Sequence, residues 1–141
     1  MAKIGIYLAN NHYVDYSLGH MLNVTLQPNY GVVIFELDGQ LSVQDFVHAA
    51  HKIDPYIGHA GGLKGGLVCV LGWPVWESFA AFSQHLTFIR NHHQHMDKIA
   101  IVSDSTSFKL VAPIYGASLQ CKIKCFAIDA IESGKDWILA D

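Results

Sequence analysis

Histidine is the side chain in this sequence with the greatest capacity for chemistry, because nine of the 141 residues are histidines. The densest group is His92, His93 and His95. A zinc site needs three or four ligands that converge on the metal at about 2.0–2.3 Å, whereas adjacent helical residues point about 100° apart. Neither a Cys-x-x-Cys nor a His-Glu-x-x-His spacing is present. We therefore expect no metal site, and interpret these histidines as residues that stabilise the negative end of a helix.

The candidate nucleophiles lack a base beside them. Cys69 lies inside an apolar run, where a thiol stays protonated and unreactive. The hydroxyls and the acid of the segment 103–107 stand at the expected start of a helix, where their usual role is capping, although a bound anion is an alternative there. Cys121 and Cys125 are separated by about 13 Å along an expected strand, which is too far for a disulfide. We predict a non-enzymatic protein without cofactors and with reduced cysteines, typical of the cytoplasm.

The composition predicts one globular domain. The chain is 51% hydrophobic and only 15% charged, with a formal net charge of −3. The absence of a Lys/Arg run argues against nucleic acid as a partner, and no apolar stretch reaches the ~18–20 residues of a membrane span. We place the domain at residues 21–141. Residues 1–20 are interpreted as an extension, either a β-hairpin or a segment that is not native.

The chain around residues 67–93 indicates the fold class. Leu67–Leu71 is a short apolar run between glycines, typical of a strand buried on both faces. After Pro74, apolar residues recur at spacings of three and four, which predicts an amphipathic helix over 74–93. The residues expected on its inner face are Val75, Phe79, Phe82, Leu86, Ile89 and His93.

The other elements follow from apolar periodicity and turn residues. Strands are predicted at 22–26, 32–37, 98–103 and 122–127. Helices are predicted from the capping-box pair Ser42 and Asp45, over 105–118, and around Trp137. The expected order is β-β-α-β-α-β-α-β-α, with the first helix ending at Pro55 and Gly58. This order predicts an α/β fold with a mixed, mostly parallel sheet of about five strands and helices packed on it.

The predicted helix over 105–118 has two apolar sides. Phe108, Val111 and Tyr115 share one face, whereas Leu110 and Ile114 lie on nearly the opposite face. A surface helix normally has a polar outer side. Its apolar outer side is expected to be covered by another subunit, an apolar ligand or a membrane surface, or by a loop or the N-terminal extension of the same chain. Pro113 removes a backbone hydrogen bond and suits a movable element.

Three segments resemble the SpoIIAA-like branch of the STAS superfamily, the anti-sigma-factor antagonist fold. They are 31–39 followed by Leu41 and Ser42, then 72–79 after the central strand, and 97–104 before the helix that contains Pro113. The resemblance extends from Met21 to Leu139. Antagonists of this superfamily carry a phosphorylatable serine where the central strand meets its helix, but residues 71–74 contain no hydroxyl here, which puts kinase-controlled switching in doubt.

The resemblance implies a small cytoplasmic STAS-like module, in a branch suspected of binding an apolar or lipid-like molecule beneath a movable helix. We expect this function, and keep as the alternative a regulatory protein–protein interaction module. A homodimer and a peripheral membrane contact are the other expected partners. The predicted ligand-binding residues are Trp73, Trp76, Phe79, Phe108, Leu110, Val111, Ile114 and Tyr115.

Overall fold

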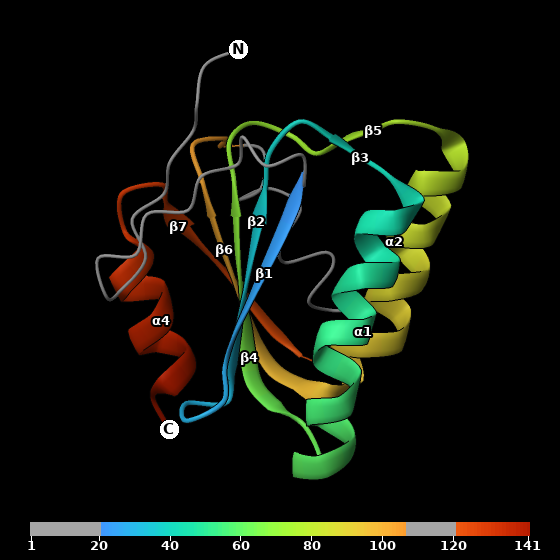
Figure 1. Cartoon of the computed structure of the whole chain (residues 1–141). Helices are drawn as coiled ribbons and strands as arrows, with labels where there is room; N and C mark the ends of the chain where they lie inside the picture. Colours follow the sequence, from blue (N-terminus) through green and yellow to red (C-terminus); the bar gives the residue numbers. More distant parts are fainter. Residues whose placement is uncertain (1–20, 107–120) are drawn as a thin grey trace.

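A five-stranded sheet forms the centre of the protein. The computed structural model describes residues 21–106 and 121–141 (Figure 1). The strand order is β1-β2-β4-β6-β7, in which β1 is antiparallel to β2 and all other neighbours are parallel. The strands are β1 (Leu22–Gln27), β2 (Val32–Leu37), β4 (Leu63–Val70), β6 (Met96–Ser103) and β7 (Lys122–Ala127). The predicted mixed, mostly parallel sheet is confirmed.

Helices cover both faces of this sheet, as Figure 1 shows. On one face lie α1 (Val43–Ala60) and α2 (Phe79–His92), and α2 continues into the 3₁₀ turn η2 (His93–His95). On the other face lies α4 (Ile131–Leu139). Most of the predicted helix over 105–118 lies outside the described residues. Three helices packed on a five-stranded sheet therefore confirm the predicted α/β class.

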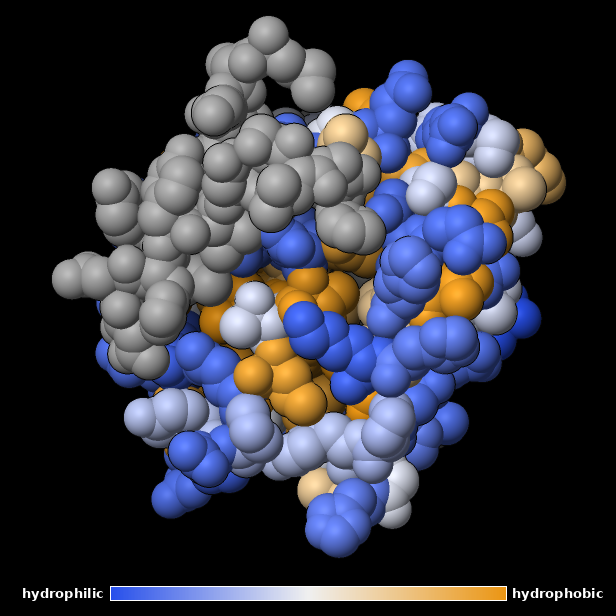
Figure 2. All heavy atoms as spheres, viewed as in Figure 1, coloured by the Kyte–Doolittle hydropathy of each residue, from blue (hydrophilic) through white to orange (hydrophobic). Residues whose placement is uncertain are grey.

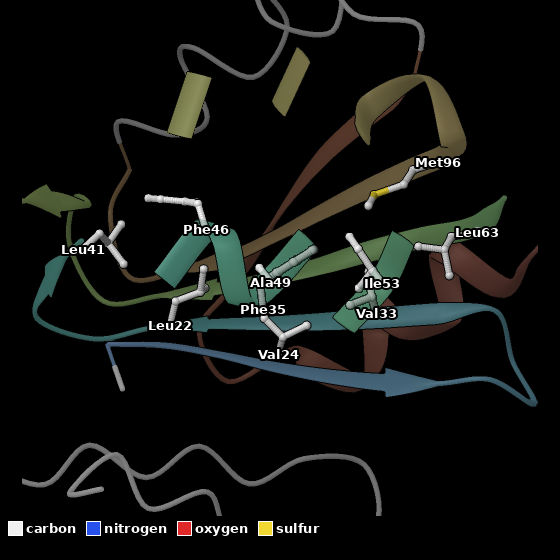
Figure 3. Packing of buried hydrophobic residues seen from close by; sticks show 10 residues of the cluster. All are labelled: Leu22, Val24, Val33, Phe35, Leu41, Phe46, Ala49, Ile53, Leu63 and Met96. Atoms are coloured by element: carbon white, nitrogen blue, oxygen red, sulfur yellow. The ribbon is translucent and has the colours of Figure 1, made fainter. Parts of the chain in front are cut away.

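Each face of the sheet carries its own apolar core, because alternate strand residues point to opposite sides. Val33 and Phe35 of β2 belong to the core under α1, with Ala49 and Ile53 of that helix (Figure 3). Ile34 of the same strand belongs to the core under α4. The predicted central strand is confirmed, since β4 lies between β2 and β6. Its residues Leu67, Cys69 and Val70 are buried.

The first helix is longer than predicted. Ser42 and Asp45 form the predicted capping box, in which each side chain accepts a bond from the other residue's backbone N–H. The helix does not end at Pro55, which lies inside it, nor at Gly58. It ends at Gly61, which adopts φ 86° and donates its N–H to the Ile57 carbonyl oxygen at 2.7 Å. Glycine suits this left-handed cap better than any residue with a Cβ.

The glycine-rich segment before the central strand is part of that strand and not the flexible connection that its composition suggests. Gly65 and Gly66 lie inside β4 and are buried. A Cβ at Gly65 would lie 2.5 Å from the Lys98 carbonyl oxygen and 2.6 Å from Ile138 Cγ2. Glycine is therefore needed here so that β6 and α4 can approach the backbone closely.

Candidate functional site

The start of α2 differs from the sequence prediction. Val75 and Trp76 form a short strand, β5 (Val75–Trp76), which pairs in parallel with β3 (Gln40–Leu41). The helix begins at Phe79, and Ser78 is its N-cap, with the Ser78 hydroxyl accepting from the Ala81 N–H at 3.1 Å. The sequence pattern places Ser78 inside the predicted helix over 74–93. In the structure it is the capping residue that precedes the helix.

The predicted inner face of α2 is also wrong. Phe79 is 82% exposed, Val75 50% and Leu86 42%. The side chains that face α1 are instead those of His85, Phe88 and His92. His85 and Phe88 make ring contacts with Phe46 of α1. Phe88 and His92 line a groove between the two helices, which is described below. Trp76 of β5 packs against Phe82 and His85, so the first of these side chains contacts β5 and not the sheet.

A row of aromatic rings connects the β5 segment to the far end of α2. We call Trp76, His85, Phe46, Phe88 and His92 the aromatic row. Successive ring centroids lie 5.8, 4.8, 6.0 and 4.1 Å apart. These separations fall within or close to the range in which aromatic pairs attract one another. The row fixes α1 and α2 side by side.

His85 within this row is a neutral hydrogen-bond acceptor. The Trp76 Nε1–H donates to His85 Nδ1 at 3.0 Å, and the imidazole ring stacks on Phe46. Burial lowers the pKa of His85 from 6.5 to about 4. The neutral ring is therefore the form present near pH 7, with Nδ1 free of a proton, as its bond to Trp76 requires.

A groove of about 540 Å³ lies between α1 and α2. Its volume is within the range of small-molecule sites, roughly 300–1,000 Å³. The lining combines apolar and polar side chains, with Phe46 and Phe88 of the aromatic row among the apolar ones. On this side of the molecule, hydrophobic atoms show between hydrophilic ones over the two helices (Figure 2). The lining residues are Phe46, Val47, Ala50, His51, Asp54, Ile57, Gly58, Gln84, Thr87, Phe88, Asn91, His92 and His95.

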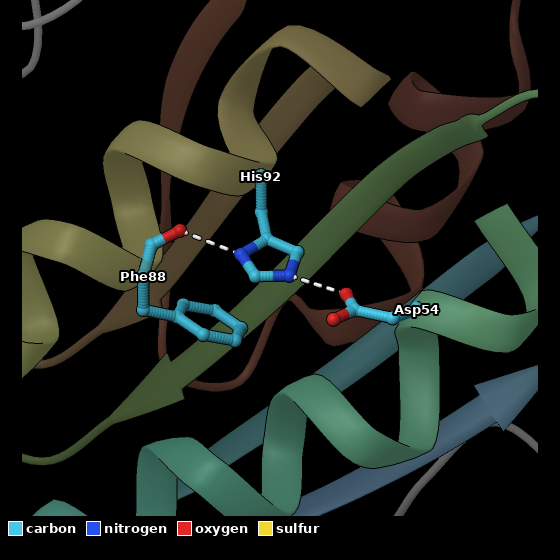
Figure 4. A network of polar contacts seen from close by, with 3 residues as sticks. All are labelled: Asp54, Phe88 and His92. Carbon is cyan, nitrogen blue, oxygen red and sulfur yellow. Dashed lines mark hydrogen bonds and ion pairs between the residues drawn. The ribbon is translucent and has the colours of Figure 1, made fainter. Parts of the chain in front are cut away.

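The polar centre of the groove is the pair Asp54 and His92 (Figure 4). His92 Nε2 lies 2.6 Å from Asp54 Oδ1, and His92 Nδ1 lies 2.7 Å from the Phe88 carbonyl oxygen. A carbonyl oxygen and an ionised carboxylate both only accept, so both contacts are satisfied when the ring carries two protons. The His92 side chain is 8% exposed and that of Asp54 57%. The carboxylate therefore lies on the solvent side of a buried imidazole.

The three described residues among those predicted from the sequence to bind a ligand do not line this groove. Trp73 and Phe79 are exposed at the start of α2, and Trp76 is half-buried beside them. The other five predicted residues lie outside the described part of the chain: Phe108, Leu110, Val111, Ile114 and Tyr115. The ligand pocket predicted between the start of α2 and the helix over 105–118 thus stays a prediction.

Sequence reasoning missed the groove, although its lining has a periodic signal. Ala50, Asp54 and Gly58 follow one another at intervals of four on α1, and Gln84, Phe88 and His92 do so on α2. Such intervals place each set on one helical stripe. The sequence alone does not show that these two helical stripes face each other.

Residues 21–106 and 121–141 contain no metal centre, and the thiol of Cys69 is not activated. No three histidine, cysteine, aspartate or glutamate side chains there could together hold a metal ion. Burial, together with the nearby Glu36, raises the pKa of Cys69 to about 12, so this thiol is protonated at neutral pH. Within the same residues, every helix is too short or too polar to cross a membrane.

Comparisons with known proteins agree on the fold. The protein-family model described as SpoIIAA-like matches residues 32–139. A crystal structure of an uncharacterized protein of the DUF3478 family from Shewanella loihica PV-4, described as having a SpoIIAA-like fold, superposes with a TM-score of 0.62. The two sequences are 15% identical, and the match covers 83% of this chain and 91% of that chain. A search of curated proteins finds no match.

Proposed function

Because this chain belongs to the SpoIIAA-like family, a STAS fold, we propose that it is a non-catalytic binding module whose ligand occupies the groove between α1 and α2. The observation that carries the proposal is the groove itself, with its volume of about 540 Å³ and its mixed lining. The protonated, buried thiol of Cys69 supports a role without nucleophilic chemistry.

The lining favours a lipid-like, amphipathic ligand. Phe46, Val47 and Phe88 offer apolar contact, whereas Asp54 and Asn91 offer hydrogen-bonding groups. A molecule with an apolar chain and a small polar head can satisfy both kinds of surface, since burying the chain contributes about 0.8 kcal/mol per fully buried CH₂ group. The ligand class is the one predicted from the sequence, but the groove is a different place from the predicted pocket.

The test uses 1-octanol, a neutral amphipath of the expected kind, followed by NMR of ¹⁵N-labelled protein. We expect saturable shifts of the backbone signals of 46–58 and 84–95, with a dissociation constant of about 1 mM or somewhat weaker for so small a molecule. Shifts spread evenly over the sheet and α4, or no saturable shift, would contradict the proposal.

A pair of matched variants locates the site. Ala50→Trp places a large ring in the groove and should weaken octanol binding by about tenfold or more, because it fills the volume that the chain needs. Lys52→Trp adds the same ring at an exposed position of α1 that does not line the groove, and should leave binding unchanged. Equal effects of the two variants would refute the groove as the site.

A second candidate function is protein–protein contact through the segment 73–79. Trp73 is 49% exposed, Val75 50% and Phe79 82%, and neighbouring exposed apolar side chains mark interaction sites. A second copy of this chain is the partner to test first. Sedimentation equilibrium should then show a dimer that Phe79→Ser dissociates. A monomer at every concentration, with and without the substitution, would rule out self-association through this segment.

A further inference from the structure

The Asp54 carboxylate lies in the half of the α1–α2 groove nearer the C-terminal ends of the two helices, in a fixed orientation. Its Oδ1 contacts His92 Nε2, and the same imidazole is tied to the Phe88 carbonyl oxygen of its own helix. Because His92 is buried and Asp54 is mostly exposed, a group that enters from solvent meets the carboxylate before it meets the imidazole. A carboxylate offers about four acceptor positions, and His92 occupies one of them.

The described lining of the groove has an acidic side chain but no lysine or arginine. Asp54 is the one carboxylate of the described lining residues, and no lysine or arginine is among them. The other titratable side chains of the lining are His51 from α1, His92 from α2 and His95 from η2. The described lining thus holds one carboxylate and no lysine or arginine, and the nearest basic group to that carboxylate is the His92 imidazole.

The C-terminal end of α2 lies beside the Asp54 carboxylate. Phe46 contacts His85, and eight residues further along α1 Asp54 contacts His92, so α1 and α2 run in the same direction. α2 ends at His92, which contacts Asp54, whereas α1 continues six residues beyond Asp54 to Ala60. The C-terminal end of a helix carries the negative end of its dipole, which attracts cations.

The opposite end of the groove is apolar. Phe46 and Val47 line it together with the uncharged Gln84. An apolar chain lying along the groove from the Asp54 end would thus pass Phe88 and Ala50 and reach these side chains. The groove thus has the Asp54 carboxylate towards one end and mainly apolar side chains at the other.

We propose that the groove selects an amphipathic primary amine, with the ammonium group on Asp54 and the apolar chain over Phe46 and Phe88. This inference rests on the function proposed above and specifies its ligand class. An ammonium group can donate to the Asp54 carboxylate in a charge-assisted hydrogen bond. A carboxylate or phosphate head in the same place would meet like charge.

The experiment compares three ligands that share one chain and differ in the head: octylammonium, 1-octanol and octanoate. Binding is measured by NMR titration at pH 8 and low salt, below the concentrations at which these molecules form micelles. We expect octylammonium to bind about tenfold tighter than octanoate, with octanol between them. At 0.5 M NaCl the difference between octylammonium and octanol should shrink, because salt screens a partly exposed ion pair.

Two variants test the role of the carboxylate. Asp54→Asn keeps the shape of the side chain and removes its charge, so the preference for octylammonium over octanol should disappear. Asp136→Asn removes an exposed carboxylate from α4 on the other face of the sheet and should leave all three affinities as they are.

The outcomes separate the two proposals. Octanoate or octanol binding as tightly as octylammonium, or an octylammonium affinity that Asp54→Asn does not change, would overturn the amine assignment and leave the groove as an amphipath site. If none of the three ligands binds, the groove is not a ligand site, and the proposed function is overturned together with the amine assignment.

Discussion

Trp76 donates its indole N–H to Nδ1 of His85 across 3.0 Å, and this single bond joins the short strand β5 to the middle of α2. It keeps the Trp76 ring against Phe82, with ring centroids 4.8 Å apart in an edge-on arrangement. The same histidine stacks on Phe46 of α1. Three separate segments thus meet at one imidazole that must stay neutral for the bond to exist.

The first prediction is that the stability of the protein depends on pH through His85. Its pKa is about 4 in the folded protein and 6.5 without the burial, so the unfolded chain binds more protons between these values. The contribution of His85 is complete above pH 6.5 and is lost as the pH falls towards 4. The pKa difference sets an upper limit of about 3 kcal/mol, and the partial exposure of the ring lowers the expected loss to about 2 kcal/mol.

The measurement is urea unfolding at pH 7 and pH 4.5. In His85→Gln the amide oxygen can still accept from Trp76, but it does not titrate. The free energy of unfolding of this variant should therefore change less between the two pH values than that of the original protein, by about 1–2 kcal/mol. His59→Gln, at an exposed position near the end of α1, should keep the difference of the original protein. Equal pH dependence in both variants would show that His85 is not the group responsible.

The second prediction concerns the pair that ties the ends of α1 and α2 together. His92→Ala removes a buried ring and its two polar contacts, and should lower the free energy of unfolding by about 2–3 kcal/mol. Asp54→Ala should cost about 1 kcal/mol or less, since the carboxylate is mostly exposed. A double-mutant cycle should give a coupling energy of about 0.5–1 kcal/mol between the two residues. Strictly additive losses would mean that the contact contributes nothing to stability.

The sequence predicts the sheet better than the helices because strand burial is a local signal. The run Leu67–Leu71 is apolar on both faces, and only a central parallel strand buries both faces of so short a segment. The capping box at Ser42 and Asp45 is likewise local, and its three-residue spacing predicts the start of α1 correctly. In both cases the pattern that carries the prediction lies within a few residues of sequence.

The start of α2 depends on contacts that the sequence does not reveal. Apolar periodicity from Val75 to His93 predicts one continuous helix, but Val75 and Trp76 pair with Gln40 and Leu41 instead. The Glu77 N–H also donates to the Leu41 carbonyl oxygen at 2.8 Å. A distant strand thus overrides the local pattern. The same limit applies to the groove, because nothing in the sequence shows that Asp54 meets His92, 38 residues later.

The third prediction concerns the reactivity of the thiols. Burial and the nearby Glu36 raise the pKa of Cys69 to about 12, and burial raises that of Cys121. Cys69 has no exposed surface, whereas Cys121 is partly exposed. In the folded protein at pH 8, iodoacetamide should therefore label Cys121 before Cys69, which should react only after unfolding in urea. Mass spectrometry of labelled peptides measures the order, and early labelling of Cys69 would place it on an accessible surface.

The last prediction compares two glycines that the sequence does not distinguish. Gly65→Ala places a methyl group 2.5 Å from the Lys98 carbonyl oxygen and 2.6 Å from Ile138 Cγ2, and a backbone oxygen in a paired strand cannot move away. The substitution should lower the free energy of unfolding by about 2–4 kcal/mol. Gly58→Ala, inside α1, has no neighbour within 4 Å of the added carbon. It should raise stability by about 0.5–1 kcal/mol, because alanine loses less backbone entropy on entering a helix. Urea unfolding of both variants measures the two effects, and a Gly65→Ala protein as stable as the original would show that β6 and α4 do not pack against Gly65 as closely as the structure places them.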